Sequence, residues 1–234
     1  MSTPTTSTTT STTASTSTST MGRSSQFESL SGETDLDFPE YDAPAADPIA
    51  LLRTWLDQAV ERGVREPRAL SLATADARGR ASTRIIALSG VSDRGLVFMS
   101  HTSSQKGREI AETGWASGLL YWRETAQQIS VSGPVEQLGD AESDALWFGR
   151  PVPMHAMSTA AHQSEPLDDV AALRAEAVRL EATGTPLPRP ERFVGYVLVP
   201  STVEFWAASS DRLHRRLRYD RLDDQSWSTS RLQP

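Results

Sequence analysis

Cysteine is absent from this chain of 234 residues, and lysine occurs only once among 23 basic side chains. The lack of cysteine excludes a disulfide framework, a cysteine nucleophile and thiolate metal sites. No run of side chains approaches the roughly 20 apolar residues that a membrane-spanning helix needs. The net charge of −7 lacks the broad basic field that general nucleic-acid and anionic-membrane binders use. We therefore expect a cytoplasmic protein that binds neither nucleic acid nor membranes.

The N-terminal segment has almost no apolar side chains. Residues 2–20 are all Ser or Thr except Pro4 and Ala14. Such a segment cannot bury enough apolar surface to offset the entropy of ordering it. It also lacks the basic start and apolar stretch of a signal peptide. We predict a disordered tail over residues 1–37 and one domain over residues 38–234, long enough to fold around its own core.

Beyond residue 38, turn signals separate short apolar runs. The first helix is expected to start at Asp47-Pro48, an N-cap followed by proline, and to end near Gly63. Further helices are expected near Lys106, over 140–148 and over 167–182, and strands over 69–75, 81–88, 95–100, 116–122, 127–138, 193–199 and 202–206. Six or seven antiparallel strands with helices at the ends favour a small barrel of the mainly-β or α+β class. No glycine-rich dinucleotide motif is present, so a Rossmann domain is not expected.

The single lysine, Lys106, lies at the predicted start of a helix, close to Arg108. The free N–H groups and the dipole at a helix N-terminus favour negative charge. The positive charges of Lys106 and Arg108 are therefore unfavourable there unless an anion binds. A phosphate or carboxylate site would explain why an arginine-rich chain uses one compact ammonium group. The alternative is a solvated lysine retained by chance.

Two further segments are candidate anion or ring contacts. Arg84 lies among strand-forming residues, so its side chain leaves one face of a sheet, either toward an anion or into a surface salt bridge. Trp206 is an aromatic residue that could stack on a planar ring. After a short loop it is followed by the basic residues Arg212, His214 and Arg216. For this last segment the alternative is a charged run exposed to solvent.

Several motifs occur in the order and spacing of the pyridoxamine 5′-phosphate oxidase family. They are Arg84-Ile85-Ile86, Gln105-Lys106, Gln128, Gln163-Ser164, Glu204-Phe205-Trp206 and Arg212-Leu213-His214-Arg215-Arg216. From about Asp47 to the C-terminus the chain resembles this family, and most of all its members that act in phenazine biosynthesis. The segments that carry the second similarity are 63–67, 73–76, 121–125 and 217–221.

The resemblance implies a split β-barrel with flanking helices that forms a homodimer and binds FMN at the subunit interface. The residues that it assigns to FMN are Arg84, Ile85, Ile86, Met99, Ser100, Gln105, Lys106, Gln128, Gln163, Ser164, Trp206 and Arg216. Arg84, Lys106 and Ser100 would hold the phosphate and ribityl region, and the others would complete the pocket from the two subunits. Their neutral amide and hydroxyl groups match the donors and acceptors of the ribityl and isoalloxazine groups. No metal is implied.

The substrate side departs from the vitamin-forming members of the family. Those members hold a substrate phosphate with a lysine, a tyrosine, an arginine and a serine, where this chain has Ser89, Leu146, Arg150 and Met154. The exchange makes the pocket more apolar, which disfavours a phosphate dianion and suits a flat ring system. Arg212 and His214, the substrate-side pair of the family, are retained and could engage a carboxylate or the reacting ring.

These residues imply an oxidase that dehydrogenates partly reduced tricyclic phenazine carboxylates on FMN, with O2 as the final acceptor and H2O2 as product. No residue is an obvious obligatory base. Oxidation of pyridoxamine or pyridoxine 5′-phosphate is the alternative reaction. A flavin- or haem-binding module without turnover is a third, because a split barrel does not fix function. The four histidines, His101, His155, His162 and His214, are scattered in sequence, which argues against a haem or metal site.

Overall fold

The computed structural model describes residue 1 and residues 31–234. Most of the predicted tail, residues 2–30, lies outside the described residues. Residues 31–37, which composition assigns to the tail, include backbone hydrogen bonds to the domain. The Glu33 N–H donates to Glu124 O at 2.8 Å, and the Asp35 N–H donates to Ala208 O at 3.1 Å. Contacts with the domain therefore begin upstream of residue 38.

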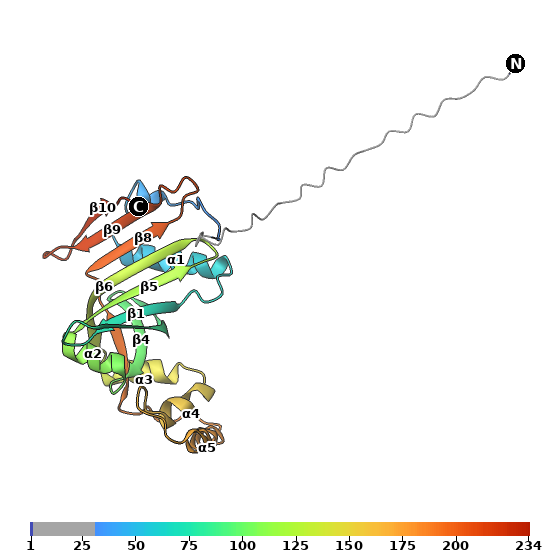
Figure 1. Ribbon diagram of the computed structural model, residues 1–234, viewed down its shortest axis with the longest axis vertical. Coiled ribbons are helices and arrows are strands. Elements are labelled where there is room, and N and C mark those ends of the chain that lie inside the picture. The colour runs from blue at the N-terminus through green and yellow to red at the C-terminus, as the bar shows by residue number, and fades with distance from the viewer. Residues whose placement is uncertain (2–30) are drawn as a thin grey trace.

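Ten antiparallel strands occur in residues 31–234 (Figure 1). They are β1 (Ala69–Ala75), β2 (Ala81–Ala87), β3 (Gly90–Ser92), β4 (Gly95–His101), β5 (Trp115–Trp122), β6 (Gln127–Gln137), β7 (Phe193–Leu198), β8 (Thr202–Ala207), β9 (Arg215–Arg221) and β10 (Trp227–Arg231). One path runs β10-β9-β8-β6-β5-β1-β2, and β7 joins β6 to β4. Residues 127–132 of β6 pair with β8, whereas residues 135–137 pair with β7. This long strand, shared between two partners, curls the sheet into a half-barrel.

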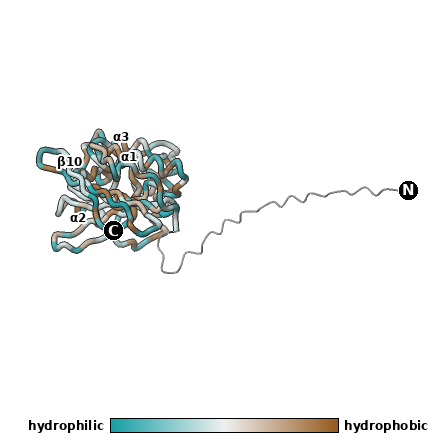
Figure 2. Tube along the Cα trace, turned by 90° about the horizontal axis from the view of Figure 1, so that it is seen from above, coloured by the Kyte–Doolittle hydropathy of each residue, from teal (hydrophilic) through white to brown (hydrophobic). Residues whose placement is uncertain are grey.

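The helices are η1 (Pro39–Tyr41), α1 (Pro48–Glu61), α2 (Gln105–Thr113), α3 (Asp140–Phe148), α4 (Pro153–Ala160) and α5 (Val170–Glu181). Helix α1 forms as the sequence predicts. Asp47 Oδ1 accepts the Ile49 N–H at 2.8 Å, and the chain turns away at Gly63 with φ of +73°. Its buried face packs on the sheet, where the Trp55 and Phe205 rings are 5.1 Å apart. In Figure 2 the hydrophobic segments, coloured brown, accordingly lie largely in the interior of the domain.

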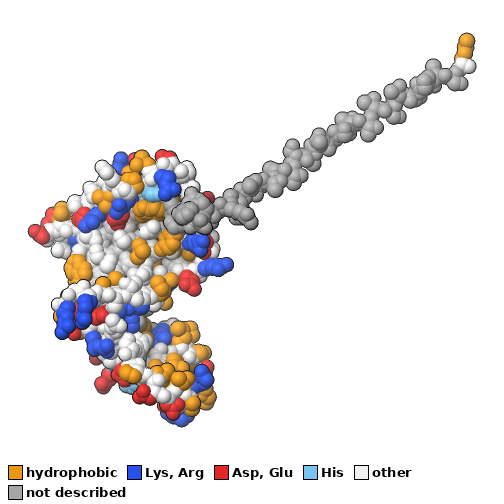
Figure 3. All heavy atoms as spheres, viewed as in Figure 1, with side chains coloured by type: hydrophobic (Ala, Val, Ile, Leu, Met, Phe, Trp, Pro, Cys, Tyr) orange, Lys and Arg blue, Asp and Glu red, His pale blue; other side chains and the backbone are white. Residues whose placement is uncertain are grey.

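Helices α3, α4 and α5 gather at the opposite end of the molecule from β10 (Figure 1). Helix α4 is absent from the sequence prediction. Its N-cap residue is Val152, which offers no side-chain hydrogen bond, so Pro153 at the first helical position is its one start signal. Hydrophobic side chains such as Met157 and Val178 are exposed on this lobe (Figure 3). Within residues 31–234, no helix is both long and apolar enough to cross a membrane.

The basic C-terminal segment is a strand over most of its length, and the hypothesis of a solvated run is wrong for β9. Leu217 and Tyr219 are fully buried, and they alternate with Arg216 and Arg218. Arg218 pairs with Asp220 at 2.7 Å. The period-two alternation is the sequence signal for this strand, although the density of charge conceals it.

Gly107 is the third residue of α2 and lies against the backbone of the preceding turn. A Cβ placed on it would lie 2.5 Å from Thr102 O and closer still to His101 O. In an open helix, Gly→Ala stabilises by about 1 kcal/mol, but these backbone carbonyls cannot rotate away. We expect Gly107→Ala to lower the free energy of unfolding by about 1–3 kcal/mol in urea denaturation. Arg108→Ala, at the exposed neighbouring position, should change it by less than about 0.5 kcal/mol; a more stable Gly107→Ala would contradict this packing.

Candidate functional site

A cavity of about 510 Å³ lies where the sheet meets α2 and the α3–α5 lobe. Its lining is Arg84, Ile85, Ile86, Ala87, Leu88, Ser89, Met99, Ser100, Lys106, Arg150, Met154, Ser158, Gln163 and Phe193. Strands β2 and β4 form one wall, and α4 and the segments flanking it form the other. The structure thus brings together most of the predicted phosphate-side residues with Ser89, Arg150 and Met154 from the predicted substrate side.

Lys106 supplies a half-buried positive charge at one end of the cavity. Its Nζ donates to Ser100 Oγ at 3.0 Å, and to Ser104 Oγ and Gln163 Oε1 at 3.3 Å each. These partners are neutral. Burial lowers the pKa of Lys106, the nearby Arg84 guanidinium lowers it further, and Glu109 opposes both effects. An anion in the cavity would relieve this concentration of positive charge.

The start of α2 is capped by hydroxyl groups of the protein itself. Ser104 Oγ accepts the Gly107 N–H at 3.2 Å, and Ser164 Oγ accepts the Gln105 N–H at 3.1 Å. The predicted attraction of an anion by free helix N–H groups is therefore wrong at these two positions. Arg108 is exposed and donates to Ser103 O, outside the cavity lining. The positive charge beside the cavity comes instead from the side chains of Lys106 and Arg84.

Arg84 is held in place by a hydrogen-bond network behind the cavity. Its guanidinium donates to Thr74 Oγ1 at 2.5 Å, to Ser82 Oγ at 2.6 Å and to Glu109 Oε2 at 3.3 Å. The side chains of Arg84 and Glu109 are 20% and 8% exposed, so the surface salt bridge considered for Arg84 is not what forms.

Glu109 is a functional candidate that the sequence analysis missed. Burial raises its pKa, but hydrogen bonds from Ser82, Thr74, Gln105 and Arg84 together outweigh burial and lower it to about 2. The carboxylate therefore stays ionised and fixes the Arg84 guanidinium. Its position four residues after Gln105, on the same helix face, was the available sequence signal.

Arg150 reaches the cavity from the helical lobe. Its guanidinium lies 4.7 Å from the Phe193 ring and 5.1 Å from the Trp147 ring. Nη2 donates to Ser158 Oγ at 3.0 Å, whereas Nη1 is buried and has no hydrogen-bond partner among the residues that the structure describes. Burial lowers the pKa of Arg150. An acceptor on a bound molecule would satisfy this buried donor.

A second cluster of predicted residues lies on β6, β8, β9 and the segment leading into β9. Gln128, Trp206 and Arg216 are neighbours across paired strands, and the Trp206 and His214 rings are 4.8 Å apart. Arg216 Nε donates to Glu204 Oε1 at 2.7 Å, and Arg212 is exposed with φ of +68°. This cluster contributes nothing to the cavity lining within one chain.

Three other predicted residues lie outside the lining. Gln105 and Ser164 contact each other at the start of α2. Leu146 covers Gly195 of β7, since a Cβ placed on Gly195 would lie 2.9 Å from Leu146 Cδ1. Among the residues that the structure describes, no three His, Cys, Asp or Glu side chains come together as a metal site.

Two models of known protein families together match almost the whole domain. The pyridoxamine 5′-phosphate oxidase model matches residues 56–184, and the pyridoxine 5′-phosphate oxidase C-terminal dimerisation region matches residues 193–234. The chain is 61% identical over 211 residues to dihydrophenazinedicarboxylate synthase of Burkholderia lata, covering 90% of this chain and 99% of that protein. The enzyme of the same name from Pseudomonas chlororaphis is 51% identical over 88% of this chain and 93% of its own length.

Solved structures of the same family have the same fold as this chain. PhzG from Burkholderia lata, solved in complex with tetrahydrophenazine-1-carboxylic acid, superposes with a TM-score of 0.85 at 60% identity, covering 87% of this chain and 100% of that chain. A pyridoxamine 5′-phosphate oxidase-related FMN-binding protein from Nostoc punctiforme has a TM-score of 0.67 at 22% identity, covering 78% of this chain and 97% of that chain, which shows the shared fold. The curled sheet is the predicted split β-barrel, and the protein is an enzyme of the oxidase class. The chain belongs to the pyridoxamine 5′-phosphate oxidase family.

The Glu109 network makes stability depend on pH in the acid range. The pKa of Glu109 falls from 4.5 to about 2 on folding, so its stabilisation is complete above pH 4.5 and is lost as pH falls toward 2. We expect the difference in unfolding free energy between the wild type and Glu109→Gln to shrink by about 3 kcal/mol across that interval. Denaturant titrations at several pH values measure it, with Glu112→Gln, an exposed change on the same helix, as baseline. A difference that does not vary with pH would contradict the assignment.

Proposed function

We propose that this protein is an FMN-dependent oxidase that dehydrogenates partly reduced tricyclic phenazine carboxylates in phenazine biosynthesis. The observation that carries the proposal is one cavity with two cations at one end and an apolar wall with a single partly unpaired arginine at the other. Relatives at 61% and 51% identity named dihydrophenazinedicarboxylate synthase support the substrate class.

The residues at the Lys106 end fit FMN. Arg84 and Lys106 supply two positive charges, which suit a terminal phosphate dianion. Ser100 and Gln163 add neutral hydroxyl and amide groups, which suit the ribityl chain. When bound, FMN supplies a two-electron acceptor. A hydride and a proton leave the reduced ring, and both electrons and two protons finally reach O2 to form H2O2.

The opposite end of the cavity fits an aromatic carboxylate better than a phosphate monoester. Met154 and Phe193 present apolar surface, and Ser89 stands where the vitamin-forming members have a lysine. The unpaired Nη1 of Arg150 offers one charged donor to a carboxylate. The role of these residues is to bind and orient the ring, and no side chain is required as a base.

We also propose that the active form is a homodimer in which the cluster around Trp206 completes the cavity of the other chain. The match to a dimerisation region over residues 193–234 supports this arrangement. The edge strand β2 adds a suitable surface, since Ile85 is 65% exposed beside a second cavity of about 360 Å³. In the dimer, Arg212 and His214 would orient the substrate over the flavin.

The function is tested with purified full-length protein loaded with FMN. Anaerobic addition of a dihydro- or tetrahydrophenazine carboxylate should bleach the yellow flavin, and air should restore it with formation of H2O2. Pyridoxine 5′-phosphate, assayed in parallel, should turn over much more slowly. Protein that neither retains nor gains flavin would overturn the proposal, and faster oxidation of pyridoxine 5′-phosphate would favour the alternative reaction.

Lys106 and Arg212 are expected to separate cofactor binding from turnover. Lys106→Ala removes a charge-assisted contact of about 1.5–3 kcal/mol, which corresponds to a roughly 10- to 150-fold higher Kd for FMN. Arg212→Ala should leave the Kd unchanged and lower kcat/KM, because Arg212 is assigned to the substrate. Flavin fluorescence titration and oxygen uptake measure the two quantities. Arg108→Ala removes an exposed cation from the same helix as a control, and full flavin occupancy of Lys106→Ala at low FMN would refute the phosphate assignment.

A further inference from the structure

His101, the last residue of β4, is completely buried behind the cavity. Its ring packs edge-on against Phe193, with 5.2 Å between the ring centroids. It does not line the cavity and takes no part in the proposed chemistry. Both of its ring nitrogens are nevertheless hydrogen-bonded, one to the last turn of α4 and the other to the segment that follows α4.

The two hydrogen bonds define the tautomer of the ring. Nε2 lies 3.1 Å from Ser158 O, and Nδ1 lies 3.3 Å from the Gln163 N–H. A carbonyl oxygen only accepts and a backbone N–H only donates, so Nε2 carries the hydrogen and Nδ1 is bare. Both bonds are satisfied only by the neutral Nε2–H imidazole.

Each partner of His101 also makes a contact inside the cavity. Gln163 places its Oε1 3.3 Å from Lys106 Nζ. Ser158 places its Oγ 3.0 Å from Arg150 Nη2. One imidazole therefore connects the lysine end of the cavity with the arginine end.

The position of Ser158 at the end of α4 explains why its carbonyl oxygen needs a donor from outside the helix. It lies in the last turn of α4, where backbone carbonyls have no partner within the helix. Arg192 holds the next part of this turn through Thr159 O and Ala161 O. His101 supplies the donor for Ser158 O and the acceptor for the Gln163 N–H, so it sets the direction in which the chain leaves α4.

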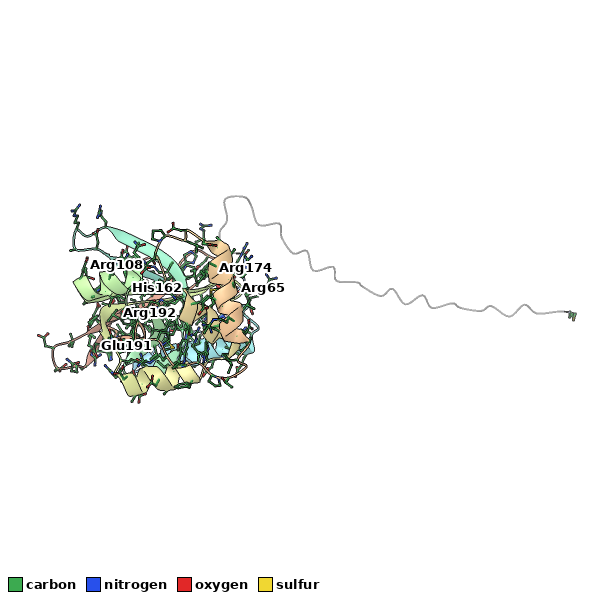
Figure 4. All side chains as sticks on the ribbon, turned by 90° about the horizontal axis from the view of Figure 1, so that it is seen from below. Arg65, Arg108, His162, Arg174, Glu191 and Arg192 are labelled. Atoms are coloured by element: carbon green, nitrogen blue, oxygen red, sulfur yellow. The ribbon has the colours of Figure 1, made fainter. Side chains whose placement is uncertain are left out.

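Burial, reinforced by nearby basic side chains, keeps the imidazole neutral. Burial is the main cause that lowers the pKa of His101 to about 4, and the nearby Arg192, His162 and Lys106 side chains lower it further, whereas the hydrogen bond to the Ser158 carbonyl raises it. Figure 4 shows Arg192 and His162 on the same side of the molecule, beside α2. A protonated ring would point an Nδ1–H at the Gln163 N–H and break that hydrogen bond.

We propose that His101 is a positioning residue that aligns the two ends of the cavity. Its Nδ1 fixes Gln163 on the Lys106 side, and its Nε2–H fixes Ser158 on the Arg150 side. The assignment rests on the proposed function, because it takes the Lys106 end as the FMN site and the Arg150 end as the substrate site.

Two substitutions separate the two hydrogen bonds. In His101→Asn, the side-chain oxygen takes the place of Nδ1 and keeps the Gln163 contact. In His101→Gln, the side-chain nitrogen takes the place of Nε2 and keeps the Ser158 contact. Loss of one neutral hydrogen bond corresponds to about a 2- to 10-fold effect. We expect His101→Asn to raise the substrate KM by this factor with little change in the Kd for FMN, and His101→Gln to do the reverse.

His155 provides the matched control. It is equally buried, its Nε2 lies 3.1 Å from Trp147 O and its Nδ1 accepts the Leu187 N–H at 3.3 Å, but neither partner lines the cavity. The Asn and Gln variants of His155 should lower the thermal midpoint without separating KM from Kd. If the His101 variants change Kd and KM together, or change neither, His101 is only a structural residue and the proposal is wrong.

The wild-type protein gives a test that does not depend on the variants folding. Nitrogen NMR of the imidazoles should show His101 as the neutral Nε2–H tautomer from pH 5 to 8, with or without FMN. An Nδ1–H tautomer, or titration near pH 6.5, would overturn the proposal. Failure of the wild type to bind FMN would instead overturn the proposed function, so the two failures are distinguishable.

Discussion

The carboxylate of Glu109 joins helix α2 to strands β1 and β2. It accepts hydrogen bonds from Thr74 on β1 and from Ser82 and Arg84 on β2. These hydrogen bonds tie α2 to the two strands, and so contribute to where the ammonium of Lys106 lies relative to the guanidinium of Arg84. A buried ion pair of this kind is weak evidence for stability, because desolvation offsets much of the attraction. Its value here is geometric, since it holds two cations beside one cavity.

Each end of the cavity holds a cation whose protein partners, among the described residues, do not neutralise or fully satisfy it. Within residues 31–234, the three hydrogen bonds that Lys106 donates all go to neutral oxygens, and Arg150 has one buried donor without an acceptor. A folded protein tolerates such groups where a ligand supplies the missing partners. The helical lobe contributes Arg150 and the sheet contributes Arg84, so the distance between the two ends depends on how α4 joins the barrel.

The predictable elements are those whose ends carry local signals. Helix α1 has an aspartate cap, a proline and a closing glycine, and it forms as expected. Helix α4 has Val152 at its cap and was missed, because tertiary contacts from His101 and Arg192 hold its end. Strand β9 was missed because its charged residues conceal the buried alternation of Leu217 and Tyr219. At the site, motif spacing found Arg84, Lys106 and Gln163 but not Glu109, whose neighbours come from two strands distant in sequence.

The sequence by itself determined the family, the barrel class and the residues that supply charge, because these follow from local patterns and from motif order. Only the tertiary structure decided that hydroxyls of the protein cap two N–H groups at the start of α2, so that the positive charge beside the cavity comes from the side chains of Lys106 and Arg84. It also decided that Leu146 packs on Gly195, and that the Trp206 cluster is separate from the cavity within one chain. The reason is that burial and hydrogen-bond partners arise from residues that the fold, and not the chain order, makes neighbours.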